Sequence, residues 1–172
     1  IAGFNRTQVA ALSTSQVASL SVTQVAALTS AAVAALAETQ VGALSQTQVA
    51  ALAQTQIRGL TGTQIIGLSE AQLGSLSATA MGAFNATQVT ALTPTQLAAL
   101  TVTQISSLSA ASLAGLTSDQ LGAVSASQLS AMTSTQLRGL TPTQIASLSD
   151  VQVASLSSTQ LSRLTAAAIS GF

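Results

Sequence analysis

The residues that most often carry chemistry in proteins are scarce in this chain, which has 172 residues, four arginines and four carboxylates. It contains no His, Cys, Tyr, Trp or Lys, so a serine would have no ordinary base to activate it and a soft metal would have no ligand. We therefore expect no enzymatic activity, no cofactor and no small-molecule substrate. The carboxylates are widely separated in the sequence and would meet only through folding; they are Glu38, Glu70, Asp119 and Asp150.

The charged residues recur in a pattern. An arginine is followed by an acid twelve residues later at Arg58 and Glu70, and again at Arg138 and Asp150. These could be docking charges where one copy of the chain meets another, or they could decorate the solvent-facing surface and bridge two short helices. The second interpretation is favoured, because exposed ion pairs contribute little to stability.

Three phenylalanines, Phe4, Phe84 and Phe172, stand at a position that is otherwise mostly leucine. They could be sites where a partner inserts, or they could fill wider parts of a core. The second interpretation is favoured. Phe4 and Phe172 remain candidate interface residues because they end two similar segments, IAGF at residues 1–4 and ISGF at residues 169–172.

The composition excludes several partners. A net charge near zero, with only 5% charged residues, gives no field that would attract phosphate or anionic lipid. Aromatic residues make up 2% of the chain, too few to stack bases, so we expect no nucleic acid. Hydrophobic residues make up 48%, which does not fit disorder. Polar residues interrupt them in every repeat, so no membrane span of about 20 apolar residues is expected.

An eight-residue repeat covers the chain from Asn5 to Phe172, giving 21 octads after a half-octad at residues 1–4. Position 1 is Ser, Thr or Asn in 19 octads, and position 4 is Gln in 17. Position 5 is always Val, Ile, Leu or Met, and position 8 is Leu in 17 octads. Positions 6 and 7 are mostly Ala, Gly or Ser. Such a regular period predicts a repeat architecture.

The first four positions of the octad read as a helix start. Ser or Thr followed three residues later by Gln is the capping box, in which each side chain bonds the backbone N–H of the other residue. Thr93 with Gln96, and Thr141 with Gln144, are examples. Both prolines fall at position 2, the first helical position, where a missing N–H has no consequence. Each octad is therefore predicted to begin a new helix.

The apolar positions indicate how these helices pack. Positions 5 and 8 are three residues apart and share one helical face, whereas a strand would need alternation. One octad gives a helix of about two turns, roughly 10 Å long, after which the chain must turn. We expect an all-α solenoid of about 21 very short capped helices, with three or four octads per coil. Positions 5 and 8 should lie inside, small residues at 6 and 7 should let coils approach, and positions 2 and 3 should face solvent.

The glutamine column allows two interpretations. It could be a ladder that reads a ligand, or it could be a set of helix caps, and the capping-box register favours caps. Because a lost cap costs about 1 kcal/mol, octads without this glutamine, such as residues 77–84, are expected to be local weak points.

A longer period of ten octads overlies the single octads. Asn5 and Asn85 each follow a Phe, and the arginine–acid pattern described above recurs at the same interval. The predicted organisation is one continuous solenoid with the end of a preceding repeat at 1–4, a ten-octad block at 5–84 and an eleven-octad block at 85–172. The start at Ile1, without a Met, suggests a piece of a longer chain.

Thr at position 3 suggests an alternative role. A regular array of threonines on a surface of low charge is what an ice-binding face needs, but a solenoid turns at corners and Thr is replaced in eight octads. A peptide lying in a superhelical groove is the other binding role that remains open.

The repeated motif TxxQVAAL resembles the octapeptide arrays of large secreted or surface proteins of bacteria, some of them similar to RTX-type adhesins. The resemblance covers all 21 octads and implies an extracellular spacer, stalk or fibre with no catalytic residue. The calcium-binding GGxGxD runs of RTX proteins are absent. The segment LTPTQLAAL at 92–100 also looks like the start of a TAL effector repeat, but the likeness is confined to that segment, and DNA binding is not expected.

The sequence thus favours a structural role outside the cell. We expect either a stalk or a protomer that associates with itself end to end or laterally.

Overall fold

The computed structural model describes residues 5–163, where every regular element is a helix of four to six residues, one per octad. The all-α class predicted from the repeat is therefore confirmed. The 21st octad, at 165–172, lies outside the described residues. In chain order the helices are α1 (Arg6–Ala10), α2 (Thr14–Ala18), α3 (Val22–Ala26), α4 (Ser30–Ala34), α5 (Glu38–Gly42), α6 (Gln46–Ala50), α7 (Gln54–Gly59), α8 (Gly62–Ile66), α9 (Glu70–Gly74), α10 (Ala78–Met81), α11 (Ala86–Ala91), α12 (Pro94–Ala99), α13 (Val102–Ser107), α14 (Ala110–Leu113), α15 (Ser118–Ala123), α16 (Ala126–Ser130), α17 (Ser134–Arg138), α18 (Pro142–Ala146), α19 (Asp150–Ala154) and α20 (Ser158–Arg163).

The helices are shorter than the two turns expected, because each octad uses its last residues to turn the corner. In α12 the N-cap Thr93 is extended (φ −71°, ψ 157°), and Leu100 at position 8 has already left helical geometry (φ −64°, ψ 142°). Two extended residues in a row, Leu100 and Thr101, separate α12 from α13. The chain therefore changes direction at the octad boundary.

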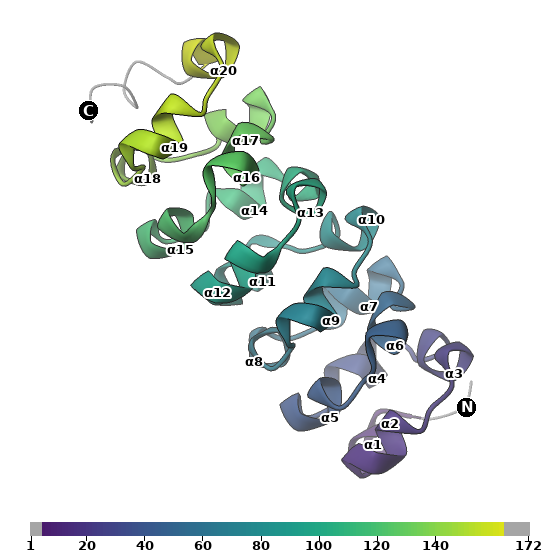
Figure 1. Cartoon of the computed structure of the whole chain (residues 1–172). Coiled ribbons are helices and arrows are strands. Elements are labelled where there is room, and N and C mark those ends of the chain that lie inside the picture. Colours follow the sequence, from purple (N-terminus) through teal and green to yellow (C-terminus); the bar gives the residue numbers. More distant parts are fainter. Residues whose placement is uncertain (1–4, 164–172) are drawn as a thin grey trace.

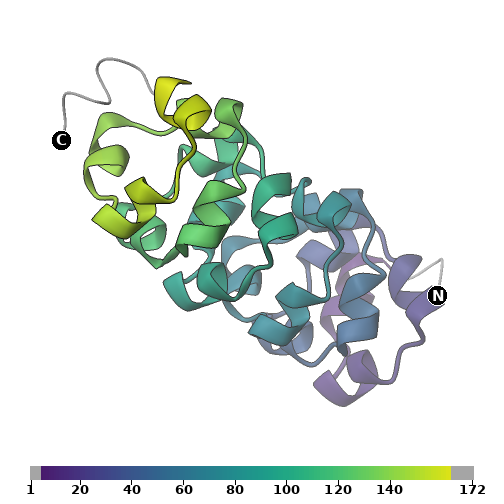
Figure 2. The same ribbon diagram turned by 45° about the horizontal axis from the view of Figure 1, so that its top comes forward.

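Three octads make one coil. Each helix packs on the third helix before it and the third helix after it, so α4 lies between α1 and α7, and α5 lies between α2 and α8. Figure 1 shows the coils stacked into an elongated rod from the N-terminal to the C-terminal end, and Figure 2 shows the last coil as a three-sided ring. Of the two coil sizes expected from the sequence, the smaller is therefore correct.

The rod has three sides, each a column of stacked helices. Side 1 consists of α1, α4, α7, α10, α13, α16 and α19; side 2 consists of α2, α5, α8, α11, α14, α17 and α20; side 3 consists of α3, α6, α9, α12, α15 and α18. An octad boundary forms each edge between two sides. Equivalent octad positions on one side recur in every third octad.

The core runs along the axis and is built from positions 5 and 8, as predicted. Side chains at position 5 are almost completely buried from Val9 to Ile145, and position 8 is buried in nearly every coil. Among the described residues, a position 5 side chain becomes exposed only in the last octad, at Leu161, where no further described coil is stacked on it. Burial of these two columns therefore depends on stacking.

Small residues at position 7 allow the coils to lie close together. A Cβ on Gly59 would lie 2.9 Å from the carbonyl oxygen of Ser30, and one on Gly139 would lie 3.1 Å from that of Ala110. In both cases position 7 of one helix rests on position 2 of the helix directly beneath it, one coil earlier in the chain. This confirms the prediction for position 7.

Position 6 mostly faces solvent instead. Arg58, Ile66 and Arg138 stand there and are exposed, and a Cβ on Gly74 or Gly122 would meet nothing within 4 Å.

Candidate functional site

The glutamine at position 4 is the most heavily bonded side chain of the repeat. The Oε1 of Gln96 accepts from the backbone N–H of Thr93 at 2.8 Å, and the Thr93 hydroxyl accepts from the backbone N–H of Gln96 at 3.1 Å. The Nε2 of Gln96 also donates to the carbonyl oxygens of Ile65 at 3.0 Å and Leu68 at 2.7 Å, one coil below. One side chain thus caps its own helix and bonds a neighbouring coil. We call the bonds from Nε2 of a position 4 glutamine to the carbonyls of the coil below a glutamine hook.

The same two functions are present at the other predicted cap. Thr141 donates its N–H to Gln144 Oε1 at 2.7 Å and its hydroxyl accepts from the Gln144 N–H at 3.2 Å. Gln144 Nε2 donates to the carbonyl of Leu116 at 2.6 Å. The glutamine hooks therefore recur at the same octad position.

The hooks follow a fixed register along the whole rod. From Gln40 to Gln160, each position 4 glutamine donates to carbonyls 28, 30 or 31 residues earlier. These carbonyls lie four octads earlier in the chain, at the C-terminal end of a helix and in the corner that follows it. The last carbonyls of a helix have no intrahelical partner, so the glutamine Nε2 supplies the hydrogen-bond donors that these carbonyls lack.

The glutamine column is therefore used by the fold itself. From Gln40 onward these side chains are buried, and within residues 5–163 every buried side-chain nitrogen or oxygen has a hydrogen-bond partner. In the first coil, Gln8, Gln16 and Gln24 form the cap bond to Asn5, Ser13 and Ser21, while no acceptor for their Nε2 lies among the described residues.

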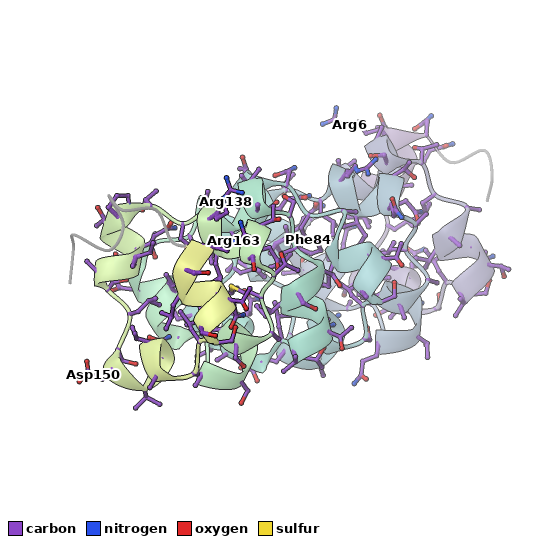
Figure 3. The ribbon with its side chains drawn as sticks, turned by 90° about the horizontal axis from the view of Figure 1, so that it is seen from above. Arg6, Phe84, Arg138, Asp150 and Arg163 are labelled. Atoms are coloured by element: carbon purple, nitrogen blue, oxygen red, sulfur yellow. The ribbon has the colours of Figure 1, made fainter. Side chains whose placement is uncertain are left out.

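The charged residues with twelve-residue spacing are exposed and lie on different sides. Arg58 lies in the last turn of α7 on side 1, and Glu70 begins α9 on side 3. Arg138 ends α17 on side 2 and Asp150 begins α19 on side 1, and Figure 3 shows these two at opposite edges of the rod. Twelve residues are half a coil, so this spacing does not stack two residues on one side.

The structure instead brings two like charges onto neighbouring helices. Arg138 and Arg163 lie in the last turns of α17 and α20, which pack on each other, and both side chains are exposed. Figure 3 shows them close together. A cation near a helix C-terminus interacts favourably with the helix dipole. The two arginines are separated by one residue more than three octads. The sequence alone does not indicate this proximity, because the spacing has meaning only once the coil is known to contain three octads.

Phe84 lies in the core with 2% of its surface exposed, in the middle of the rod (Figure 3). It fills space that a leucine occupies in other coils. Phe4 and Phe172, the two candidate interface phenylalanines, lie outside the described residues.

The position 3 threonines are exposed but divided among three sides. One side of one coil contributes a single position 3 residue, and the column on side 3 is interrupted by Ala71 and Asp119. Several of the hydroxyls also bond the adjacent cap, as Thr95 does to Thr93 at 2.9 Å. The array is therefore three separate columns, not one dense face.

The described surface is hollowed shallowly at corners between stacked coils. One groove lies where the corner between α8 and α9 stacks under the start of α12, and its lining includes Ile66, Glu70, Thr93 and Thr95. A similar groove lies one coil below, beside Ser45 and Ser69. Both are features of the repeat and lie along the edge between sides 2 and 3.

Within residues 5–163, no group of His, Cys, Asp or Glu side chains is arranged to hold a metal ion. None of the helices in this part of the chain has both the length and the apolar character needed to cross a bilayer.

The stacked coils and the hooks between them define a tandem-repeat protein with a helical solenoid fold. A family model described as the ALTTAQ repeat matches residues 129–166, which span parts of six octads. No curated protein matches the chain. The comparison thus agrees with the repeat character read from the sequence.

The hook was missed by sequence reasoning, although the sequence contains a signal for it. A capping box accepts Glu as well as Gln at its last position, yet position 4 is Gln in 17 octads and Glu in none. Only the amide provides the N–H donors that the corner carbonyls require. The exclusion of Glu therefore indicates a second bond that a cap alone does not need.

Proposed function

We propose that this chain is a structural rod that serves as an extracellular stalk or spacer. The observation that supports this role is the ladder of glutamine hooks, which joins stacked coils by directional hydrogen bonds along most of the rod. The position 4 glutamines, which a binding protein could use for recognition, form hydrogen bonds within the fold instead. The resemblance to octapeptide arrays of secreted bacterial proteins supports the location.

The proposed rod is short for its length of chain. Neighbouring helices pack about 8–10 Å apart, so one coil of three octads advances the rod by about 9 Å, or about 0.4 Å per residue. A single α-helix advances about 1.5 Å per residue. The three-sided coil therefore gives a shorter but thicker rod than a single helix of the same number of residues, which suits a spacer that must resist bending.

Small-angle X-ray scattering tests this proposal. Deleting one coil of three octads, residues 85–108, should shorten the maximum dimension by about 9 Å and leave the cross-section unchanged. A full chain that scatters as a compact sphere, or a deletion that leaves the length unchanged, would refute the rod.

A second version of the role is end-to-end association with another copy. It is favoured by Gln8, Gln16 and Gln24, whose amide nitrogens have no acceptor among the described residues. The corner carbonyls of Leu148 and Leu156 are the matching acceptors at the other end, since Gln152 and Gln160, the last glutamines, hook the earlier corners at Val124 and Met132. Preceding or following repeats of a longer chain would satisfy the same groups.

Analytical ultracentrifugation separates these two versions. Association that weakens in a variant with all three glutamines changed to alanine would support end-to-end assembly. A monomer at every concentration, with no fibres under the electron microscope, would leave the stalk alone.

A further inference from the structure

Helix α10 is attached to the rest of the rod differently from its neighbours. The Ser77 hydroxyl accepts from the backbone N–H of Ala80 and caps the helix, but because Ala80 stands at position 4, the Ser77 N–H has no glutamine oxygen to which it can donate. At the corner one coil below, the carbonyl of Leu52 receives no side-chain donor among residues 5–163, whereas those of Leu44 and Leu60 do. The hook beneath α10 is therefore missing.

The attachment above α10 is also reduced. Ser112 replaces the glutamine of the octad that reaches the end of α10, and its hydroxyl donates one bond, at 2.9 Å, to the carbonyl of Phe84. The glutamines of the flanking octads, Gln104 and Gln120, each reach two or three carbonyls. Side-chain hooks thus join α10 to the coil above by one bond and to the coil below by none.

Apolar packing takes the place of these bonds. The octad buries four apolar side chains, Ala80, Met81, Ala83 and Phe84, where most octads bury two. Burial of apolar surface is favourable but has no direction, whereas a hydrogen bond weakens steeply when its angle or distance changes. Helix α10 is therefore held in the core without being fixed in register.

The loss is confined to one side of the rod. The corner at Leu52 joins side 3 to side 1, and the corner at Phe84 joins side 1 to side 2. Along the remaining edge, between sides 2 and 3, Gln72 and Gln96 hook the corners at the same level. The coils can therefore separate at α10 while the opposite edge stays bonded.

We propose that residues 77–84 form a compliant joint at which the rod bends by opening side 1 about the bonded edge between sides 2 and 3. This inference rests on the proposed rod function, because a joint matters only in a chain that transmits force or sets a distance. The joint lies where the two sequence blocks meet, at residues 84 and 85.

Amide hydrogen exchange on the full chain tests the first half of the proposal. The amides of Met81 and Phe84 should exchange about 10- to 100-fold faster than those at the same positions of octads 69–76 and 85–92, because the hook beneath α10 is missing and the hook above it is reduced to one bond. Restoring the common residues with Ala80→Gln, Phe84→Leu and Ser112→Gln together should remove this difference. Equal exchange in the three octads of the unmodified chain would overturn the joint.

A control variant keeps the test decisive if the triple variant fails to fold. Gln88→Ala removes the hook of the next octad and should create a second region of fast exchange at residues 85–92. If that octad stays as protected as before, hooks do not govern local opening and the proposal is wrong.

Distances measured between spin labels test the bending itself. The chain has no Cys, so labels can be placed at exposed threonines two coils apart: Thr55 and Thr103 on side 1, with α10 between them, and Thr39 and Thr87 on side 2, with α8 between them. The side 1 pair should give a clearly broader distance distribution. Equal widths would refute bending at α10, while the scattering experiment above judges the rod separately.

Discussion

Replacing the hook glutamine gives the sharpest test of how the rod is held together. Gln96→Ala removes the bond from the Thr93 N–H and the bonds to the carbonyls of Ile65 and Leu68. Gln16→Ala removes only the bond from the Ser13 N–H, at 2.8 Å. The pair separates the cap from the hook on the same residue type at the same octad position.

The expected magnitudes follow from the number of bonds. A typical hydrogen bond contributes about 1 kcal/mol net to stability, so Gln16→Ala should lower the free energy of unfolding by about 1 kcal/mol and Gln96→Ala by about 3 kcal/mol. The carbonyls left behind by Gln96→Ala are buried and add to its cost. Urea denaturation followed by circular dichroism measures the difference, which should be about 2 kcal/mol.

Glutamate at the same two positions should act with opposite signs. Gln16→Glu places an exposed carboxylate in the first turn of α2, where it interacts favourably with the helix dipole. Gln96→Glu places a carboxylate against two buried carbonyl oxygens, because Gln96 is 4% exposed. It should destabilise by more than Gln96→Ala.

The pH dependence of Gln96→Glu has a definite sign. Burial and the carbonyl oxygens should raise the folded-state pKa of the introduced carboxyl above its unfolded value of about 4.3. The destabilisation is therefore full at neutral pH and declines as the pH falls through the folded pKa, where the protonated group can donate to a carbonyl. Equal effects of Gln96→Ala and Gln16→Ala, or a Gln96→Glu variant as stable as the original chain at neutral pH, would refute the hook.

Four further substitutions test the corners and the coil spacing, each by thermal or urea unfolding. Gly59→Ala should destabilise because its Cβ would lie 2.9 Å from the carbonyl of Ser30, whereas Gly122→Ala meets nothing within 4 Å and should stabilise by about 0.5–1 kcal/mol; equal effects would contradict the close coil contact. Ala53→Ser should stabilise by about 1 kcal/mol, since this N-cap lacks a side-chain acceptor, and no gain would contradict the capping argument. Val102→Pro should be neutral or stabilise by up to about 1 kcal/mol, because Val102 is the exposed first residue of α13 and its N-cap is extended; a large loss would place the helix start elsewhere.

The local parts of this fold were predictable because they depend on neighbouring residues. The register of Thr93 and Gln96 fixes where a helix begins, and the spacing of Leu97 and Leu100 fixes which face is buried. These signals act over three or four residues. A single octad therefore contains enough information to predict its own helix and corner.

The sequence allows three or four octads per coil, because this number depends on how far each corner turns. That angle is set by extended residues such as Leu100 and Thr101 and by packing against the coil below, neither of which a single octad specifies. The hooks of Gln96 and the placement of Arg138 and Arg163 on stacked helices follow from the coil, so they were missed for the same reason. The recurring interval between an arginine and the next acid is visible in the sequence, but it has a geometric meaning only once the number of octads per coil is known.

The three-octad coil and the ten-octad sequence period are mismatched. Ten octads equal three coils and one extra octad, so a feature that recurs after ten octads is displaced by one third of a turn. Arg58 therefore faces the direction of side 1 while its counterpart Arg138 faces that of side 2. In a longer array with this ten-octad period, equivalent residues would follow a helical path around the rod, and only every third one would face the same direction.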